Sequence, residues 1–130
     1  LIPGSTGGRQ LIHHHRGRDR IVFVVAGENI GRRWGSVPLL DFTASVKFLR
    51  DSIERFGEGM IDFTENDHSV RFVSHGDSVR VEDSWASGVL ACHKEEFLAA
   101  VTCFVDRVIQ DLATEFPAIR SNVFFVQLGE

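Results

Sequence analysis

Cys92 and His93 are neighbours in this sequence, and a thiol beside an imidazole is a pair that could act as a nucleophile and its base. Adjacent side chains of an extended chain point in opposite directions, so the two groups are poorly placed for proton transfer. We therefore interpret Cys92 as a buried structural cysteine. The segment from His75 to Ser78 holds the residue types of a hydrolase triad, but it lacks a G-x-S-x-G elbow and has the composition of a tight turn. We assign no catalytic residue, and an enzyme is the less favoured function.

Three consecutive histidines, His13, His14 and His15, raise the question of a metal site. On a strand only His13 and His15 would share a face, and no nearby cysteine or set of carboxylates completes a tetrahedral site. We therefore predict no metal ligands.

A glycine-containing loop, residues 27–36, leads into a predicted helix and carries Arg32, Arg33 and Trp34. Glycines before a helix N-terminus can hold a phosphate, but the loop has neither the Lys-Ser/Thr ending of a P-loop nor the G-x-G-x-x-G spacing. We expect no nucleotide and no other cofactor. Because Arg and Trp are enriched among binding hot spots, these three residues are candidates for an interface anchor. The favoured alternative packs Trp34 on the core.

A series of short strands is predicted between Met60 and His93, and it would position the candidate residues of this segment. Residues 60–64, 69–72 and 78–82 alternate between apolar and polar, which is the pattern of strands with one buried face. Their connectors are too short for parallel crossovers, so the strands form an antiparallel meander. The apolar run 88–92 is predicted as a fourth strand of the same sheet, either central or the most covered one. The predicted core face consists of Ile61, Phe63, Val70, Phe72, Val79 and Val81.

Two amphipathic helices flank this meander. The first begins near Pro38 and ends before Gly57, with an apolar stripe that runs from Leu39 to Phe56. The second has Glu95 and Glu96 in its first turn and ends before Pro117. Residues 10–15 and 20–25 are interpreted as a hairpin, and residues 123–126 as either a short strand or a tail packed on the core.

Two helical stripes and one apolar sheet face have to be buried together, which predicts an α+β fold. We expect a two-layer single domain over residues 11–130, in which both helices pack on one face of an antiparallel meander sheet of four to six strands. Residues 1–10 are expected to be a flexible leader. No apolar run approaches the length of about 20 residues that a membrane span requires, so the chain is expected to be soluble. Two cysteines do not make a disulfide framework, so we expect a cytoplasmic location.

The formal net charge is -4, and the sheet region is its acidic part. Asp62, Arg71, Arg80 and Glu82 are predicted to lie on the outer face of the sheet, where opposite charges can pair across strands. Glu58, Glu65, Asp67, Asp77 and Asp83 add to the acidic surplus. This surplus suits a basic partner and makes nucleic-acid binding an unfavoured function.

Phe48 lies off the apolar stripe of the first helix, where it either forms an interface or packs under the amino-terminal arm. Together with the charged residues above, Phe48 and Trp85 complete the candidate binding residues. The favoured function is a non-catalytic protein-interaction module that presents an acidic surface to a basic partner, as a small bacterial immunity or inhibitor protein does. One alternative is a small-molecule-binding domain or small enzyme with a pocket between helices and sheet, near His93, Trp85 and Trp34. Another is a homodimer formed through the outer faces of the helices.

Overall fold

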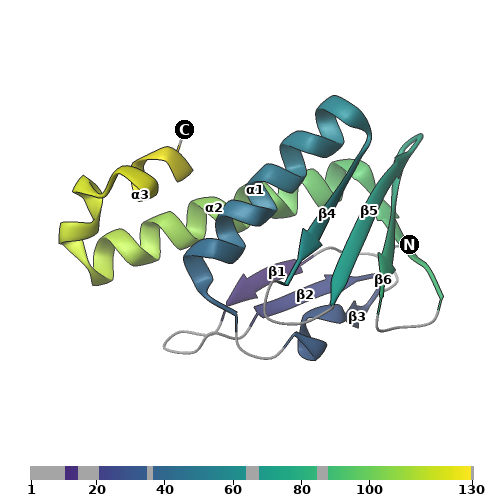
Figure 1. The fold of residues 1–130 in the computed structure, drawn as a ribbon, viewed down its shortest axis with the longest axis horizontal. Coiled ribbons are helices and arrows are strands. Elements are labelled where there is room, and N and C mark those ends of the chain that lie inside the picture. Colours follow the sequence, from purple (N-terminus) through teal and green to yellow (C-terminus); the bar gives the residue numbers. More distant parts are fainter. Residues whose placement is uncertain (1–10, 15–20, 35–36, 64–67, 85–87, 130) are drawn as a thin grey trace.

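A computed structural model of the chain describes residues 11–14, 21–34, 37–63, 68–84 and 88–129, and confirms the α+β fold (Figure 1). The elements in chain order are β1 (Leu11–His14), β2 (Ile21–Val25), β3 (Glu28–Asn29), the 3₁₀ helix η1 (Ile30–Arg33), α1 (Leu39–Phe56), β4 (Glu58–Asp62), β5 (Ser69–His75), β6 (Ser78–Asp83), β7 (Leu90–His93), α2 (Lys94–Glu115), the 3₁₀ helix η2 (Pro117–Ser121) and α3 (Val123–Leu128).

The predicted meander is present as the antiparallel sheet β4-β5-β6-β7. Of its predicted core face, Phe63 is partly buried and the other five side chains are buried. The fourth strand differs from the prediction, because β7 lies at an edge of the sheet rather than in its centre. Its exposed Ala91 explains the misleading pattern, since a small apolar residue needs no cover.

The predicted amino-terminal hairpin is also present, but it belongs to a second sheet with the order β1-β2-β3. Asn29 ends this sheet, because its side-chain Oδ1 accepts hydrogen bonds from the backbone N–H of Phe23 at 3.0 Å and of Gly31 at 3.1 Å. Those two bonds turn the chain from β3 into η1. In Figure 1 the strands β1 and β2 run crosswise to β4 and β5.

Both long helices bury most of their predicted stripes, with Leu39 and Leu112 partly buried and one exposed residue. Phe56 is 76 % exposed although the spacing places it on the stripe of α1. It is the last residue of the helix, and Gly57 follows in the left-handed region at φ 79°, so the chain turns away before the sheet can cover Phe56. Next to this turn, β4 runs back along α1 so closely that a Cβ at Gly59 would lie 2.6 Å from Leu49 Cδ1.

The carboxyl-terminal residues 123–128 form α3, so the strand alternative for this segment was wrong. Asn122 caps the helix, because its Oδ1 accepts a hydrogen bond from the Phe125 N–H at 3.1 Å. Phe125 and Leu128 are buried, which agrees with a tail that packs on the rest of the molecule.

One hydrophobic core joins both sheets to both long helices. Phe23 of β2 is fully buried, and its ring centroid lies 5.9 Å from that of Phe72 in β5 and 6.4 Å from that of Phe97 in α2. This aromatic cluster holds the second sheet against the first sheet and against α2.

Candidate functional site

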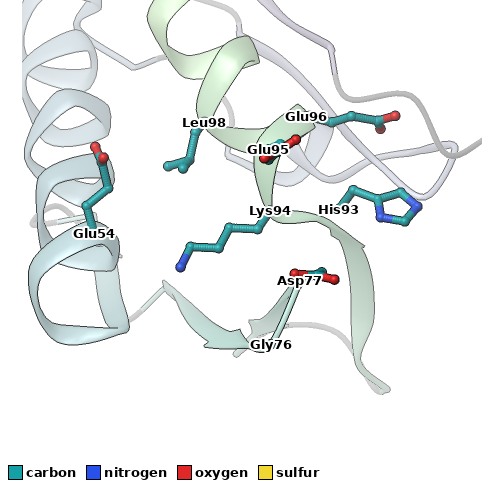
Figure 2. Close-up of a pocket in the computed structure, with 8 residues that line it drawn as sticks. All are labelled: Glu54, Gly76, Asp77, His93, Lys94, Glu95, Glu96 and Leu98. Carbon is teal, nitrogen blue, oxygen red and sulfur yellow. The ribbon is translucent and has the colours of Figure 1, made fainter.

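An open depression of about 800 Å³ lies where α1, the β5–β6 turn and the start of α2 meet (Figure 2). Its lining residues are Glu54, Gly76, Asp77, His93, Lys94, Glu95, Glu96 and Leu98. We call this feature the acidic depression.

The register of the sheet brings the parts of the acidic depression together. Ser78 of β6 pairs with His93 of β7, so the tight turn before β6 lies beside the first residue of α2. A backbone hydrogen bond of 2.7 Å from the Lys94 N–H to the Asp77 carbonyl fixes this junction. Gly76 adopts φ 62°, a left-handed conformation that suits glycine and makes the turn tight. The last turns of α1 add Glu54 from the other side.

Charge dominates the acidic depression. Among the residues that the structure describes, four exposed carboxylates line it against one ammonium group, that of Lys94, and Leu98 is the apolar side chain. In Figure 2, Lys94 and Leu98 extend toward the side where Glu54 lies, whereas His93 and Glu96 extend to the opposite side. Glu95 and Glu96 also occupy the first turn of α2, where the helix dipole favours negative charge. The arrangement is suited to holding cationic groups of a partner.

Cys92 lies directly before these residues and is buried, with its Sγ 3.8 Å from the Val79 carbonyl oxygen. Burial raises the pKa of the Cys92 thiol to about 12, and the negative charge of Glu96 adds to this shift. A thiol that stays protonated at neutral pH is a poor nucleophile, which agrees with a structural role.

The predicted outer face of the sheet carries its candidate residues in the expected places. Asp62, Arg71 and Arg80 are exposed and Glu82 is half-buried. Arg71 pairs in register with Glu82, while its guanidinium group lies 3.4 Å from a carboxylate oxygen of Glu58. Three carboxylates thus stand against two guanidinium groups among the described strands of this face, so its charge is nearly balanced.

Much of the acidic surplus predicted for the sheet region is not on this outer face. Asp77 lines the acidic depression, and Asp83 is buried against His68. Glu65 and Asp67 lie outside the described residues. Trp85 and the side chains of Arg32 and Arg33 also lie outside the described part of the chain, so their predicted binding roles stay predictions.

The two aromatic candidates have opposite environments. Trp34 is buried, with its ring centroid 5.0 Å from Phe63 and 5.5 Å from Phe42, as the favoured core interpretation predicts. This burial leaves little Trp34 surface for a partner. Phe48 is 72 % exposed on α1. A homodimer through the outer helix faces stays a prediction.

A buried His68–Asp83 pair lies apart from the acidic depression and was not identified from the sequence. His68 Nε2 lies 2.5 Å from Asp83 Oδ1, and the His68 ring packs against Phe63 at a centroid distance of 5.3 Å. The pair joins the residue before β5 to the last residue of β6, so it closes one end of the β5–β6 ladder. This position indicates a structural role.

Sequence reasoning missed most of the acidic depression. His93 was expected near a pocket, and Glu95 and Glu96 were recognised only as charges at a helix start. Glu54 was not singled out, and Asp77 was counted only in the acidic surplus of the sheet region. Their proximity did not follow from the sequence, because it depends on the packing of α1 against the sheet. The tight turn at Gly76 and the strand that leads directly into α2 were the signals that could have joined Asp77 to His93.

Within the described ranges, no group of three or more His, Cys, Asp or Glu side chains is placed to hold a metal ion. None of the described helices has the length and apolar character to cross a membrane. Comparisons with protein families, with curated proteins and with solved structures find no match to this chain.

Proposed function

We propose that this protein is a non-catalytic interaction module that binds a basic segment of another protein in the acidic depression. The observation that carries this proposal is the set of four exposed carboxylates around one lysine in a depression of about 800 Å³. Carboxylates held by three separate elements give a fixed charge pattern, which favours specificity and fast association with a cationic partner.

The lining favours a protein segment over a small organic ligand. Small-molecule sites are mostly apolar with a few polar groups, whereas Leu98 stands here among charged side chains. An arginine or lysine of a partner could place its aliphatic stem on Leu98 and its charged end beside Glu54. Inhibition of a basic enzyme or toxin, as immunity proteins perform it, is one form that such binding could take.

The test is isothermal titration of the protein with an arginine- and lysine-rich peptide at low and at physiological ionic strength. One variant neutralises the acidic depression by substituting Glu54→Gln, Asp77→Asn, Glu95→Gln and Glu96→Gln. We expect its Kd to rise by about tenfold or more, because several close charge pairs are lost at once.

A matched control neutralises the same number of exposed carboxylates elsewhere, by Glu28→Gln, Asp41→Asn, Asp62→Asn and Asp106→Asn. This control has the same net charge as the first variant, and we expect it to bind the peptide within about twofold of the parent protein, because distant charges are screened. Equal weakening in both variants would show that the net charge binds the peptide and would refute the proposed site. Absence of binding at physiological ionic strength would refute it too.

A further inference from the structure

The carboxyl-terminal helix α3 packs on the molecule separately from the main core. Phe125 and Leu128 are buried, yet they lie outside the continuous core cluster that joins the two sheets, α1 and α2. They form a satellite contact through which a helix of six residues packs on the rest of the molecule. So short a helix is not stable in isolation, so α3 depends on its docking.

One lysine of α1 caps the carboxyl end of this helix. Lys47 Nζ donates hydrogen bonds to the carbonyl oxygens of Gln127 at 2.9 Å and Leu128 at 3.0 Å. The last carbonyl groups of a helix have no partners inside it, and a positive charge suits the negative end of the helix dipole. Lys47 therefore stabilises α3 and docks it on α1 with the same two hydrogen bonds.

The segment that connects α2 to α3 is mostly exposed to solvent. Helix α2 ends at Glu115, and η2 follows with residues that are exposed, apart from the half-buried Ile119. The contact between α1 and α2 has its own bonds, such as the 2.8 Å hydrogen bond from Arg50 to Thr102. Beneath the end of α3, a Cβ at Gly129 would lie 3.9 Å from Cδ1 of the partly buried Ile109 in α2.

We propose that residues 117–129 form a latch that detaches as a unit while the rest of the molecule stays folded. Opening breaks the two Lys47 hydrogen bonds. It exposes Phe125 and Leu128, together with the apolar side chain of Ile109 in α2. The core cluster and both sheets keep their contacts. The latch thereby gives the protein a second, open state in which an apolar surface that is absent from the closed state becomes accessible.

Hydrogen exchange of the whole chain, read by mass spectrometry, tests this proposal. We expect the amides of Phe125, Val126 and Gly129 to exchange at least about tenfold faster than those of α1 and α2, because they open without global unfolding. Lys47→Met should raise exchange in residues 117–129 by about tenfold, since hydrogen bonds to a charged group are lost. Lys47→Arg should restore protection, because a guanidinium group can donate to the same carbonyl oxygens.

Arg107→Met is the matched control, because it removes an exposed cation of α2 and leaves Lys47 in place. We expect it to leave exchange of residues 117–129 unchanged. Exchange of these residues at the rate of the core of α1 and α2 would refute the latch. Equal effects of Lys47→Met and Arg107→Met would also refute it, because net charge rather than the cap would then control opening.

Discussion

Because the Cys92 thiol is buried, the free energy of unfolding varies with pH in the alkaline range. The pKa of this thiol rises from 9.0 in an unfolded chain to about 12 in the folded protein. Below pH 9 both states keep the proton and stability is unaffected. As the pH rises from 9 toward 12, the unfolded state loses its proton first, so stability falls by up to about 1.4 kcal/mol per pH unit.

We predict that Cys92→Val removes this part of the pH dependence. The measurement is the free energy of unfolding by urea, at steps from pH 8 to pH 11 with a reductant present. Cys103→Ser is the control, because it removes the other cysteine side chain, which is exposed whereas that of Cys92 is buried. A slope above pH 9 that is as steep in Cys92→Val as in the parent protein would contradict the assignment.

Individual residues also show where periodicity is a good guide to burial and where it fails. On α1, Phe42 lies on the predicted apolar stripe and is buried, whereas Phe48 lies off the stripe and is exposed. Phe56 obeys the same spacing and is exposed, because the chain turns away at Gly57. Helical periodicity predicts burial only where other elements pack along the whole apolar stripe. At the last residue of α1 this packing ends.

At the scale of elements, the His68–Asp83 pair closes one end of the β5–β6 ladder. The backbone supports the same junction, because the Ser84 N–H donates to the Ser69 carbonyl at 2.9 Å and the Ser69 N–H donates to Ser84 Oγ at 3.0 Å. Both side chains of the pair are almost fully buried. Removal of either one leaves a buried polar group behind.

We predict that His68→Ala and Asp83→Ala each lower the free energy of unfolding by about 3 kcal/mol. The double variant should lose less than the sum of the two, because the second substitution removes the group that the first one left buried. Urea unfolding of the four proteins measures this cycle. Additive losses would show that the two side chains act independently.

Local patterns predicted the elements whose partners are close in sequence. The meander, the amino-terminal hairpin and both long helices follow from alternation, turn residues and helical stripes. The edge position of β7 and the existence of a separate β1–β3 sheet did not follow, because they depend on which strands meet in space. Helix α3 had one local signal, the capping residue Asn122 before an apolar run.

At the scale of the whole molecule, Phe23 joins layers that lie far apart in the sequence. Its contacts with Phe72 and Phe97 connect the second sheet to the first sheet and to α2. We therefore predict that residues 11–116 unfold in one cooperative step. In the parent protein, far-ultraviolet and near-ultraviolet circular dichroism should give coincident urea transitions. In Phe23→Leu the two transitions should also coincide, at a lower urea concentration. Beyond the small early change that opening of residues 117–129 would give, two separated transitions in the parent protein would mean that the two sheets are independent units.

The candidate site is a property of this tertiary arrangement. Glu54 reaches the acidic depression only because α1 packs along β4 and ends beside the β5–β6 turn. The sequence-based hypothesis of an acidic binding surface stays a prediction. Among the described residues, the outer face of the sheet is nearly balanced in charge and Asp83 is buried, whereas four carboxylates gather around the acidic depression.

The register that pairs Ser78 with His93 has a consequence for protein engineering. Apart from Glu54, the described residues that line the acidic depression fall within the stretch 76–98, in the β5–β6 turn, at the end of β7 and in the first turns of α2. Such a stretch can be transplanted as one cassette into another meander that leads into a helix, with a single glutamate supplied by the host. New loop sequences at Gly76 and Asp77 could then vary the charge of the depression while the host provides the core.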